Sequence, residues 1–201
     1  MNYFKILILL LGIIQAEKCF GQTKFSKVLS QQIDSLKFED QKPLQIKNSD
    51  SAAIAFQRVI RTNFPFVKNI LGQYGFPGND LVGEESSNNY WLLVQHSDFD
   101  VPFQKRALEL MKVQVDLKNA SGQKYAYLLD RININESRPQ IYGTQVNMGE
   151  KGTTLKPCID PSKLDERRLS VGLSPIKEYI KKCDDLFYEM NKGKLIKPVE
   201  R

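Results

Sequence analysis

The sequence predicts a mainly α-helical single domain that carries one small β-hairpin. Apolar residues recur every three or four positions through most of the chain, which is the period of an amphipathic helix. Period-two alternation is confined to residues 132–145, on both sides of a short polar break. The chain has 201 residues, of which 41% are hydrophobic and 26% charged, as expected for one ordinary globular domain.

The first 22 residues are predicted to be a secretory signal peptide. Lys5 precedes an apolar run over residues 6–14, and short polar residues follow it. This run is shorter than the ~20 apolar residues that a membrane-spanning helix needs. A charged start, a short apolar core and a polar exit are typical of an export signal, with a buried N-terminal helix as the alternative. We therefore expect cleavage between residues 16 and 22 and a periplasmic or secreted domain, residues 23–201, that has no membrane attachment.

Three helices are predicted in the N-terminal half, over residues 24–37, 53–71 and 84–96. The second has an apolar stripe formed by Ala53, Phe56, Ile60, Phe64, Val67 and Leu71. Pro65 interrupts this stripe and lacks the N–H that a helix interior uses, which predicts a kink or two abutting helices broken near residues 62–63. Residues 39–48 are predicted to be a connection. The glycine-rich segment 72–83 matches no phosphate-binding or dinucleotide-binding motif.

A further helix is predicted to begin with Asp100 as its N-cap and Pro102 in its first turn, and to end near residues 119–122. A short helix through residues 126–129 then leads into the hairpin. Its strands are expected at 132–135 and 140–145, joined by the polar break 136–139. After a loop over 149–161, two closing helices are predicted at 164–171 and 176–190.

Composition also limits the classes of partner. The net charge is +6, but the basic residues are scattered without interleaved aromatics, so no nucleic-acid partner is expected. Cleavage near Gln22 would leave Cys158 and Cys183. Either they pair in an oxidising compartment, or Cys183 is a helix core residue and Cys158 is exposed. No metal-type cysteine spacing occurs, and we expect neither a metal nor another cofactor. The sequence indicates no particular protein partner.

His96, the sole histidine, lies at the predicted end of a helix beside Asp98 and Asp100. This position suits a general acid or an anion-binding group, with a structural hydrogen-bonding role as the alternative.

Six ordered motifs resemble those of a bacterial family of domains of unknown function, over residues 40–180. They are Tyr-Gly-Phe-Pro-Gly (74–78), Leu-Val-Gly (81–83), Val-Gln-His-Ser-Asp (94–98), Ala-Tyr-Leu-Leu-Asp-Arg-Ile (126–132), Pro-Gln-Ile-Tyr-Gly-Thr-Gln (139–145) and Asp-Glu-Arg-Arg-x-x-x-Gly-Leu (165–173). The resemblance implies that the family's marked positions are Gln95, His96, Asp130, Arg131, Gln140, Tyr142, Gly143, Thr144, Gln145, Arg167 and Arg168. The sequence departs from the family pattern at Lys42-Pro43, which follows Asp40-Gln41, and at Ser137.

Two functional hypotheses follow. In the first, the domain binds a small polar or anionic ligand, a peptide or a glycan; the predicted ligand-binding residues are Gln95, Asp130, Arg131, Gln140, Thr144, Gln145, Arg167 and Arg168. The alternative is a hydrolase or lyase in which His96 is the general acid or base and Tyr142 assists, although no Gly-x-Ser-x-Gly nucleophile motif occurs. Burying so many polar groups is costly unless they satisfy each other or a ligand. We therefore expect His96, Arg131, Tyr142, Gln145 and at least one of Arg167 and Arg168 to line one concave pocket.

Overall fold

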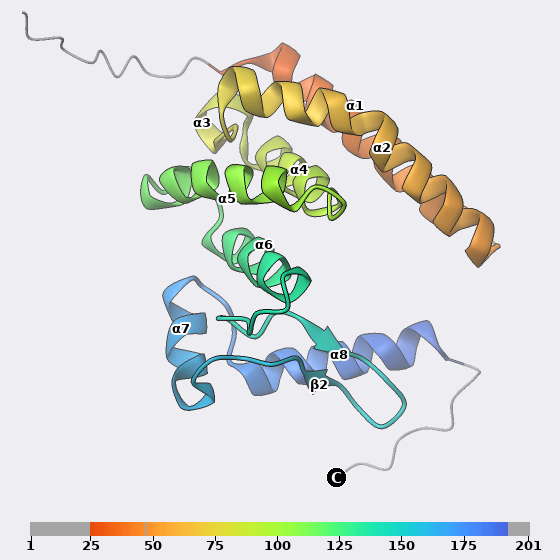
Figure 1. Cartoon of the computed structure of the whole chain (residues 1–201), viewed down its shortest axis with the longest axis vertical. Coiled ribbons are helices and arrows are strands. Elements are labelled where there is room, and N and C mark those ends of the chain that lie inside the picture. The colour runs from red at the N-terminus through yellow and green to blue at the C-terminus, as the bar shows by residue number, and fades with distance from the viewer. Residues whose placement is uncertain (1–24, 47, 193–201) are drawn as a thin grey trace, which may run out of the picture.

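The computed structural model describes residues 25–46 and 48–192 of the chain. These residues form eight α-helices, two short 3-10 helices and a two-stranded antiparallel sheet (Figure 1). The predicted class, mainly α with one small hairpin, is confirmed. The predicted signal peptide, residues 1–22, lies outside the described residues.

The helices and strands follow one another along the chain in the order shown by the colours of Figure 1. Their bounds are α1 (Lys27–Gln41), η1 (Lys42–Gln45), α2 (Ser49–Tyr74), α3 (Asn79–Val82), α4 (Glu84–Gln95), α5 (Val101–Asp116), α6 (Gly122–Asn135), β1 (Val146–Asn147), β2 (Thr154–Leu155), η2 (Pro161–Lys163), α7 (Leu164–Ser170) and α8 (Ile176–Met190).

Short polar side chains fix where four of the long helices begin. The side chains of these N-cap residues each accept a hydrogen bond from the backbone N–H three residues further on; they are Ser26, Asn48, Asp100 and Ser121. Such a bond satisfies one of the N–H groups that a helix start leaves without a partner. The predicted N-cap role of Asp100 and the place of Pro102 in the first turn of α5 are both confirmed.

Of the two alternatives predicted for the second helix, two abutting helices are wrong, because α2 is one continuous helix with Pro65 inside it; a kink at the proline stays a prediction. A proline in a helix interior costs ~3 kcal/mol or more. Buried side chains lie on both sides of the proline, with Ile60 before it and Val67 and Ile70 after it. Their burial contributes roughly 1.5–3 kcal/mol each, which outweighs the single lost hydrogen bond.

The hairpin lies further along the chain than predicted. Residues 132–135 are the last turn of α6, and the sheet pairs Val146 of β1 with Leu155 of β2. Ile132 is buried on α6, at helical spacing from Leu128, so its alternation with neighbouring polar residues reflects the end of a helix and not a strand. Residues 141–145 belong to neither helix nor strand, and Gln140 forms only an isolated bridge with Cys158.

The elements are arranged in successive layers (Figure 1). The pair α1 and α2 lies at one end, α4 and α5 form the next layer, α6 follows, and the hairpin lies with α7 and α8 at the other end. Helix α4 contacts α1, α2, α3, α5 and α6, which places it at the centre of the hydrophobic core. Its Tyr90 and Trp91 are buried there, and the hydroxyl of Tyr90 donates a hydrogen bond of 2.9 Å to the carbonyl oxygen of Val67.

Within the described parts of the chain, we find no helix that has both the length and the apolar character to cross a membrane.

The buried stripe of α2 gives a direct stability test. Ile60 is 7% exposed, whereas Ile54 on the same helix is 72% exposed. We expect Ile60→Ala to lower the free energy of unfolding by about 2–5 kcal/mol, because it leaves a cavity in the core. Ile54→Ala should change it by less than about 0.5 kcal/mol. Urea melts of both variants check this, and a loss below ~0.5 kcal/mol for Ile60→Ala would show that the stripe is not packed.

Candidate functional site

Asp130 on α6 organises the irregular segment 140–145. Its side chain is fully buried, and its carboxylate accepts hydrogen bonds from the backbone N–H groups of Ile141 at 2.7 Å, Tyr142 at 3.1 Å and Thr144 at 3.0 Å. The hydroxyl of Thr144 donates a further one at 2.9 Å. Gly143 has a φ of +65°, a backbone conformation that side-chain-bearing residues rarely adopt, and this lets the chain curl around the carboxylate.

Gln140 closes the two ends of the same segment. Its side-chain oxygen accepts a hydrogen bond from the N–H of Gln145 at 2.8 Å. Its Nε2 donates to the carbonyl oxygens of Gln145 at 2.8 Å and Lys156 at 2.9 Å. The buried amide therefore supplies the acceptor for the N–H of Gln145, whose carbonyl oxygen also accepts from the backbone of Lys156, and it ties the segment to the chain near β2.

Two arginines of α7 bind the carbonyl groups of the segment. Arg167 donates to the oxygen of Ile141 at 2.8 Å. Arg168 donates to the oxygens of Tyr142 at 2.7 Å and Gly143 at 3.2 Å. Asp130 thus satisfies the N–H side of the segment while the arginines satisfy its C=O side. Many of the predicted ligand-binding residues therefore have their hydrogen-bonding groups occupied by backbone.

A second polar group surrounds His96, the C-cap of α4. Its Nδ1 lies 2.8 Å from Oδ2 of Asp40, a residue near the end of α1 that is only 1% exposed. The ring edge of Phe56 on α2 packs against the imidazole, with centroids 5.1 Å apart. The His96 side chain itself is 16% exposed, so it is held by a buried carboxylate yet reaches the surface.

The turn that follows His96 is fixed by Asp98, Gln104 and Arg131. Arg131 of α6 donates to both oxygens of Asp98 through Nε, at 2.8 and 3.0 Å, and again through Nη2. Gln104 is fully buried, and its Nε2 donates to Asp98 and to the carbonyl oxygens of residues 94 and 95 at 3.1 Å each. Burial alone would raise the pKa of Asp98, but the hydrogen bonds and charge of Arg131 outweigh it and lower that pKa.

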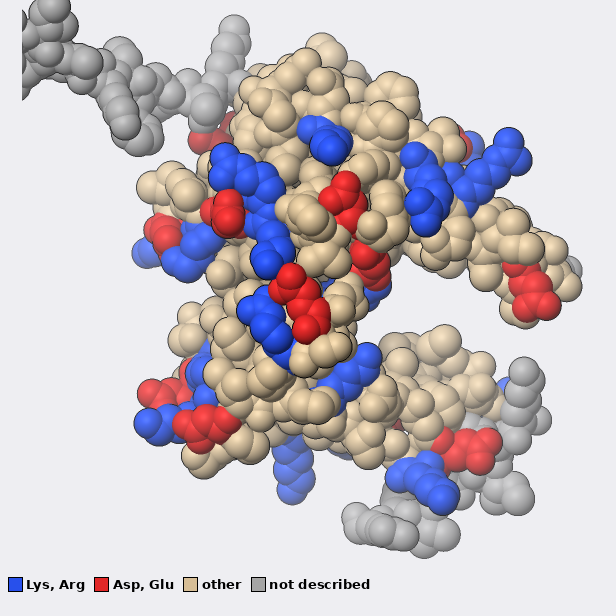
Figure 2. Space-filling model, viewed as in Figure 1, with Lys and Arg blue, Asp and Glu red and all other residues tan. Residues whose placement is uncertain are grey.

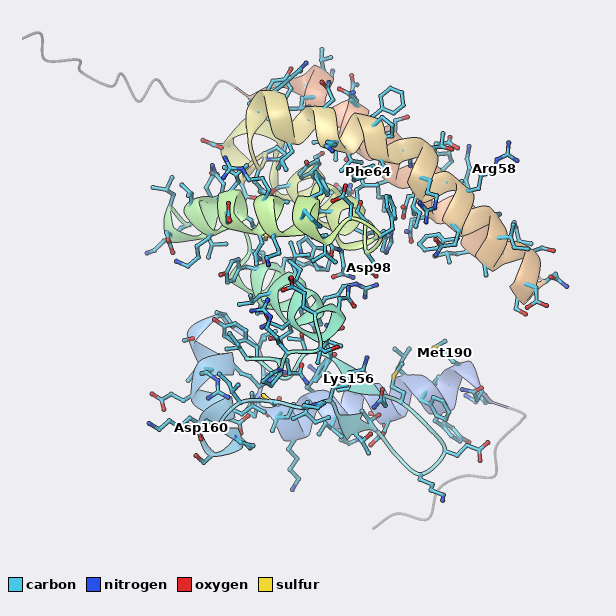
Figure 3. The ribbon with its side chains drawn as sticks, in the orientation of Figure 1. Arg58, Phe64, Asp98, Lys156, Asp160 and Met190 are labelled. Atoms are coloured by element: carbon cyan, nitrogen blue, oxygen red, sulfur yellow. The ribbon has the colours of Figure 1, made fainter. Side chains whose placement is uncertain are left out.

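We call Asp40, His96, Asp98, Gln104 and Arg131 the histidine cluster. Its members come from α1, α4, the α4–α5 turn, α5 and α6. Asp98, labelled in Figure 3, lies at the end of the α4–α5 layer, close to the C-terminal end of α6. The ion pair and hydrogen bonds fix the cluster geometry without a ligand.

Tyr142 and Gln145, two further residues of the predicted site, make no hydrogen bond to His96 within the described chain. Burial raises the pKa of Tyr142, and the nearby Tyr125 and Asp130 add to this effect. Gln145 donates from Nε2 to the Thr144 hydroxyl at 3.1 Å. The side chain of Gln95 is half-buried. A pocket of about 580 Å³ is lined by Arg168, but by no other residue of the predicted site, so the expected common pocket is not this one.

The reason for this separation lies on α6. Asp130 and Arg131 are adjacent, and consecutive helical residues point in different directions. Asp130 therefore faces the 140–145 segment while Arg131 faces Asp98. Whether any of the predicted residues contacts a ligand stays a prediction.

Sequence reasoning missed the most direct partner of His96. Asp40 and His96 are 56 positions apart, and no local pattern connects the end of one helix with the end of another. Gln104 and Asn135 were also missed, although both donate to Asp98 at 3.1 Å. The only sequence signal was the Asp40-Gln41 pair that precedes the departure at Lys42-Pro43.

The part of the chain that the structure describes gives no geometric support for a metal site. Within residues 25–46 and 48–192, no three His, Cys, Asp or Glu side chains are grouped so that they could hold an ion. The two cysteines of this region, Cys158 and Cys183, are both free, and Cys183 is buried on α8 as one of the two hypotheses expected.

A family of unknown function, DUF6624, has a model that matches residues 15–192. The chain belongs to this family. Membership agrees with the resemblance seen in the ordered motifs, and it brings no assigned activity, so a function for the DUF6624 domain has to be argued from its geometry. No similar protein was found among curated proteins or solved structures.

Replacing Asp130 tests the organisation of the 140–145 segment. In Asp130→Asn one acceptor oxygen becomes an NH₂ group that faces backbone N–H donors. We expect a loss of about 2–4 kcal/mol in the free energy of unfolding, because buried donors are left without acceptors. Asp185→Asn on the exposed face of α8 is the matched control, and it should cost less than about 1 kcal/mol. Equal free energies of unfolding for the two variants, measured in urea melts, would contradict the organising role of Asp130.

Proposed function

We propose that the chain is an exported domain that binds a small polar or anionic ligand at the histidine cluster and acts on it, as a hydrolase or lyase, through His96. The observation that carries this proposal is the 2.8 Å contact between Nδ1 of His96 and the buried Asp40. A carboxylate on Nδ1 fixes the orientation and tautomer of an imidazole, and it stabilises the cation that forms when Nε2 takes a proton.

The surroundings of Asp40 support a functional role for its carboxylate in addition to a structural one. Its Oδ1 is buried with no hydrogen-bond partner among the described residues, while Oδ2 contacts His96 and the adjacent Gln41. Burying a carboxylate is costly unless it is paired. His96 is the only partner that another element supplies to Asp40 within the described chain, which supports a role for this carboxylate in orienting the imidazole.

His96 and Arg131 both retain groups that a ligand can use. His96 makes no hydrogen bond through Nε2 with the described residues. Arg131 contacts Asp98 through Nε and Nη2, which leaves Nη1 for an anionic or carbonyl oxygen. Nearby, the guanidinium of Arg61 lies over the ring of Phe99 at 4.5 Å and adds positive charge beside the turn. The cluster therefore combines a proton-transfer group with donors for a negatively charged ligand.

The nucleophile of a hydrolytic reaction would be water. Among the described residues no serine, threonine or cysteine side chain hydrogen-bonds to His96. An imidazole that removes a proton from water, or from a carbon next to a carbonyl group, matches this arrangement. Tyr142, whose neighbours are Asp130 and Tyr125, is not part of this proposal.

Binding without turnover is the second candidate function. It is favoured by the pairing of Asp98 with Arg131, because two groups that neutralise each other form a recognition surface with little catalytic power. In that case the cluster would hold a polar ligand, a peptide or a glycan, and His96 would act as a hydrogen-bonding group.

A substrate panel separates these two functions. The mature protein is incubated with chromogenic esters, phosphoesters, glycosides and amides, and turnover is followed by absorbance. We expect His96→Gln to lower kcat/KM by about 10²–10⁴-fold, as for loss of a general acid or base, and Asp40→Asn to lower it at least about tenfold. Arg138→Gln, on the exposed side of the turn after α6, is the control and should retain activity.

Circular dichroism melts of the same variants show whether the fold persists. Full activity in a folded His96→Gln variant would reject the catalytic proposal. Binding of a panel compound by the wild type without turnover, and its loss in His96→Gln, would identify the binding function instead.

Export is tested on the expressed protein. The apolar run over residues 6–14 motivates the proposal, and mass spectrometry of the mature protein should find an N-terminus between residues 17 and 23. Leu9→Arg places a charge inside the apolar run and should leave the precursor unprocessed. Wild-type protein that retains Met1 in the cytoplasmic fraction would contradict export.

A further inference from the structure

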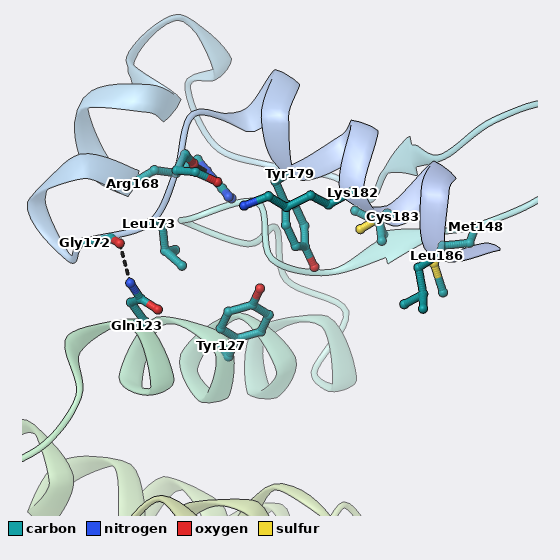
Figure 4. Close-up of a pocket in the computed structure, with 12 residues that line it drawn as sticks. Gln123, Tyr127, Met148, Arg168, Gly172, Leu173, Tyr179, Lys182, Cys183 and Leu186 are labelled. Carbon is teal, nitrogen blue, oxygen red and sulfur yellow. Dashed lines mark hydrogen bonds between the residues drawn. The ribbon is translucent and has the colours of Figure 1, made fainter. Parts of the chain in front are cut away.

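A second candidate site lies between α6 and α8, away from the histidine cluster. It is a pocket of about 580 Å³, within the range of 300–1,000 Å³ typical of small-molecule sites (Figure 4). It is formed by the start of α6, strand β1, the end of α7 with the turn that follows, and α8. The lining residues used below are Tyr127, Met148, Arg168, Leu173, Tyr179, Lys182 and Leu186.

The charged residues of the pocket are all positive. Arg168 and Lys182 line it, and no aspartate or glutamate does. Arg168 is 1% exposed, and its Nε and Nη1 donate only to carbonyl oxygens, those of Tyr142, Gly143 and Ser174. Neither Arg168 nor Lys182 forms an ion pair within the described chain, although Lys181, next to Lys182, pairs with Asp185.

Arg168 is a buried cation with no carboxylate in direct contact, and such a group can bind an anion. Burying a charge is costly unless an opposite charge accompanies it. Asp165 and Asp130 attract the guanidinium only from beyond ion-pair distance, and the ring of Tyr179, 4.8 Å from the guanidinium carbon, compensates a further part of this cost. Nη2 of Arg168 has no hydrogen-bond acceptor among the described residues. Its N–H groups therefore remain for a carboxylate oxygen.

Apart from Gln123 and Ser174, the other side chains that line the pocket are apolar or aromatic. The rings of Tyr127 and Tyr179 meet edge to face, with centroids 6.2 Å apart, and Leu173 is buried beside them. Met148 and Leu186 are 42% and 53% exposed, so they form an apolar rim. Figure 4 shows both at the end of the pocket away from Arg168, whereas Leu173 lies near Arg168. The exposed apolar rim and the buried guanidinium are therefore at opposite ends of the pocket.

We propose that this pocket binds an amphiphilic carboxylate, with its anionic group at Arg168 and Lys182 and its apolar chain against Tyr127, Leu173, Met148 and Leu186. A small inorganic anion would leave the apolar rim uncovered, and a neutral apolar molecule would leave the buried guanidinium without an anionic group in direct contact. A ligand with both an anionic group and an apolar chain contacts the cations and also covers the apolar rim. This inference does not depend on His96, because no residue of the histidine cluster lines the pocket.

Three matched probes test the proposal on the mature protein by isothermal titration calorimetry. Decanoate carries the charge and the chain, 1-decanol carries the chain alone, and acetate carries the charge alone. We expect decanoate to bind, and each of the other two to bind at least about tenfold more weakly. Equal binding of decanol would overturn the role of the cations, and equal binding of acetate would overturn the role of the chain. Absence of decanoate binding would overturn the proposal entirely.

Variants locate the bound probe. Leu186→Glu replaces an apolar rim residue by a negative charge and should weaken decanoate binding at least about tenfold. Leu169→Glu makes the same change at a 75% exposed position that does not line the pocket, and it should leave binding unchanged. Lys182→Gln removes the exposed cation and should weaken binding about two- to fivefold. Equal affinities for Leu186→Glu and Leu169→Glu would place the decanoate elsewhere.

Discussion

The carboxylate of Asp130 is the interaction on which the C-terminal half of the domain depends. A segment without helix or strand still has backbone donors and acceptors that need partners when it is buried. Asp130 supplies the acceptors, and Arg167 and Arg168 supply the donors. Because the segment connects α6 to the hairpin, and the arginines belong to α7, this one set of hydrogen bonds fixes how the hairpin and α7 lie against the helical layers (Figure 1).

The same chemistry holds the turn after α4, with a different outcome. There the amide of Gln104 binds two carbonyl oxygens and Asp98, so the turn is as firmly held as the segment at Asp130. The two sites differ in whether a hydrogen-bonding group remains free for another molecule. Every group of the Asp130 carboxylate is occupied by its own protein, whereas His96 is oriented by Asp40 and keeps one ring nitrogen for other molecules. The surface is hollowed between the N-terminal half of α2 and the hairpin with α8, as Figure 2 shows.

Much of the helical architecture was predictable, because it depends on local signals. The closing helix was predicted over 176–190 and is found at Ile176–Met190, and α5 begins at the expected N-cap, Asp100. The hairpin was misplaced because Ile132 and Ile134 fit the last turn of a helix as well as a strand. The site was harder to predict. Polar residues such as Gln140 look alike in a sequence whether they bind a ligand or their own backbone, and the contact of Asp40 with His96 exists only once α1 and α4 have packed.

Arg168 has two roles. It donates hydrogen bonds to the carbonyl groups of Tyr142 and Gly143, and it also lines the pocket beside α8. An anion that draws on its guanidinium would stiffen the side chain that anchors the 140–145 segment. Thermodynamic linkage then works in both directions: occupancy would slow amide hydrogen exchange in that segment, and loosening the segment would weaken the hold on the anion. The ordering of the 140–145 segment and the binding of an anion in the pocket are thereby thermodynamically coupled.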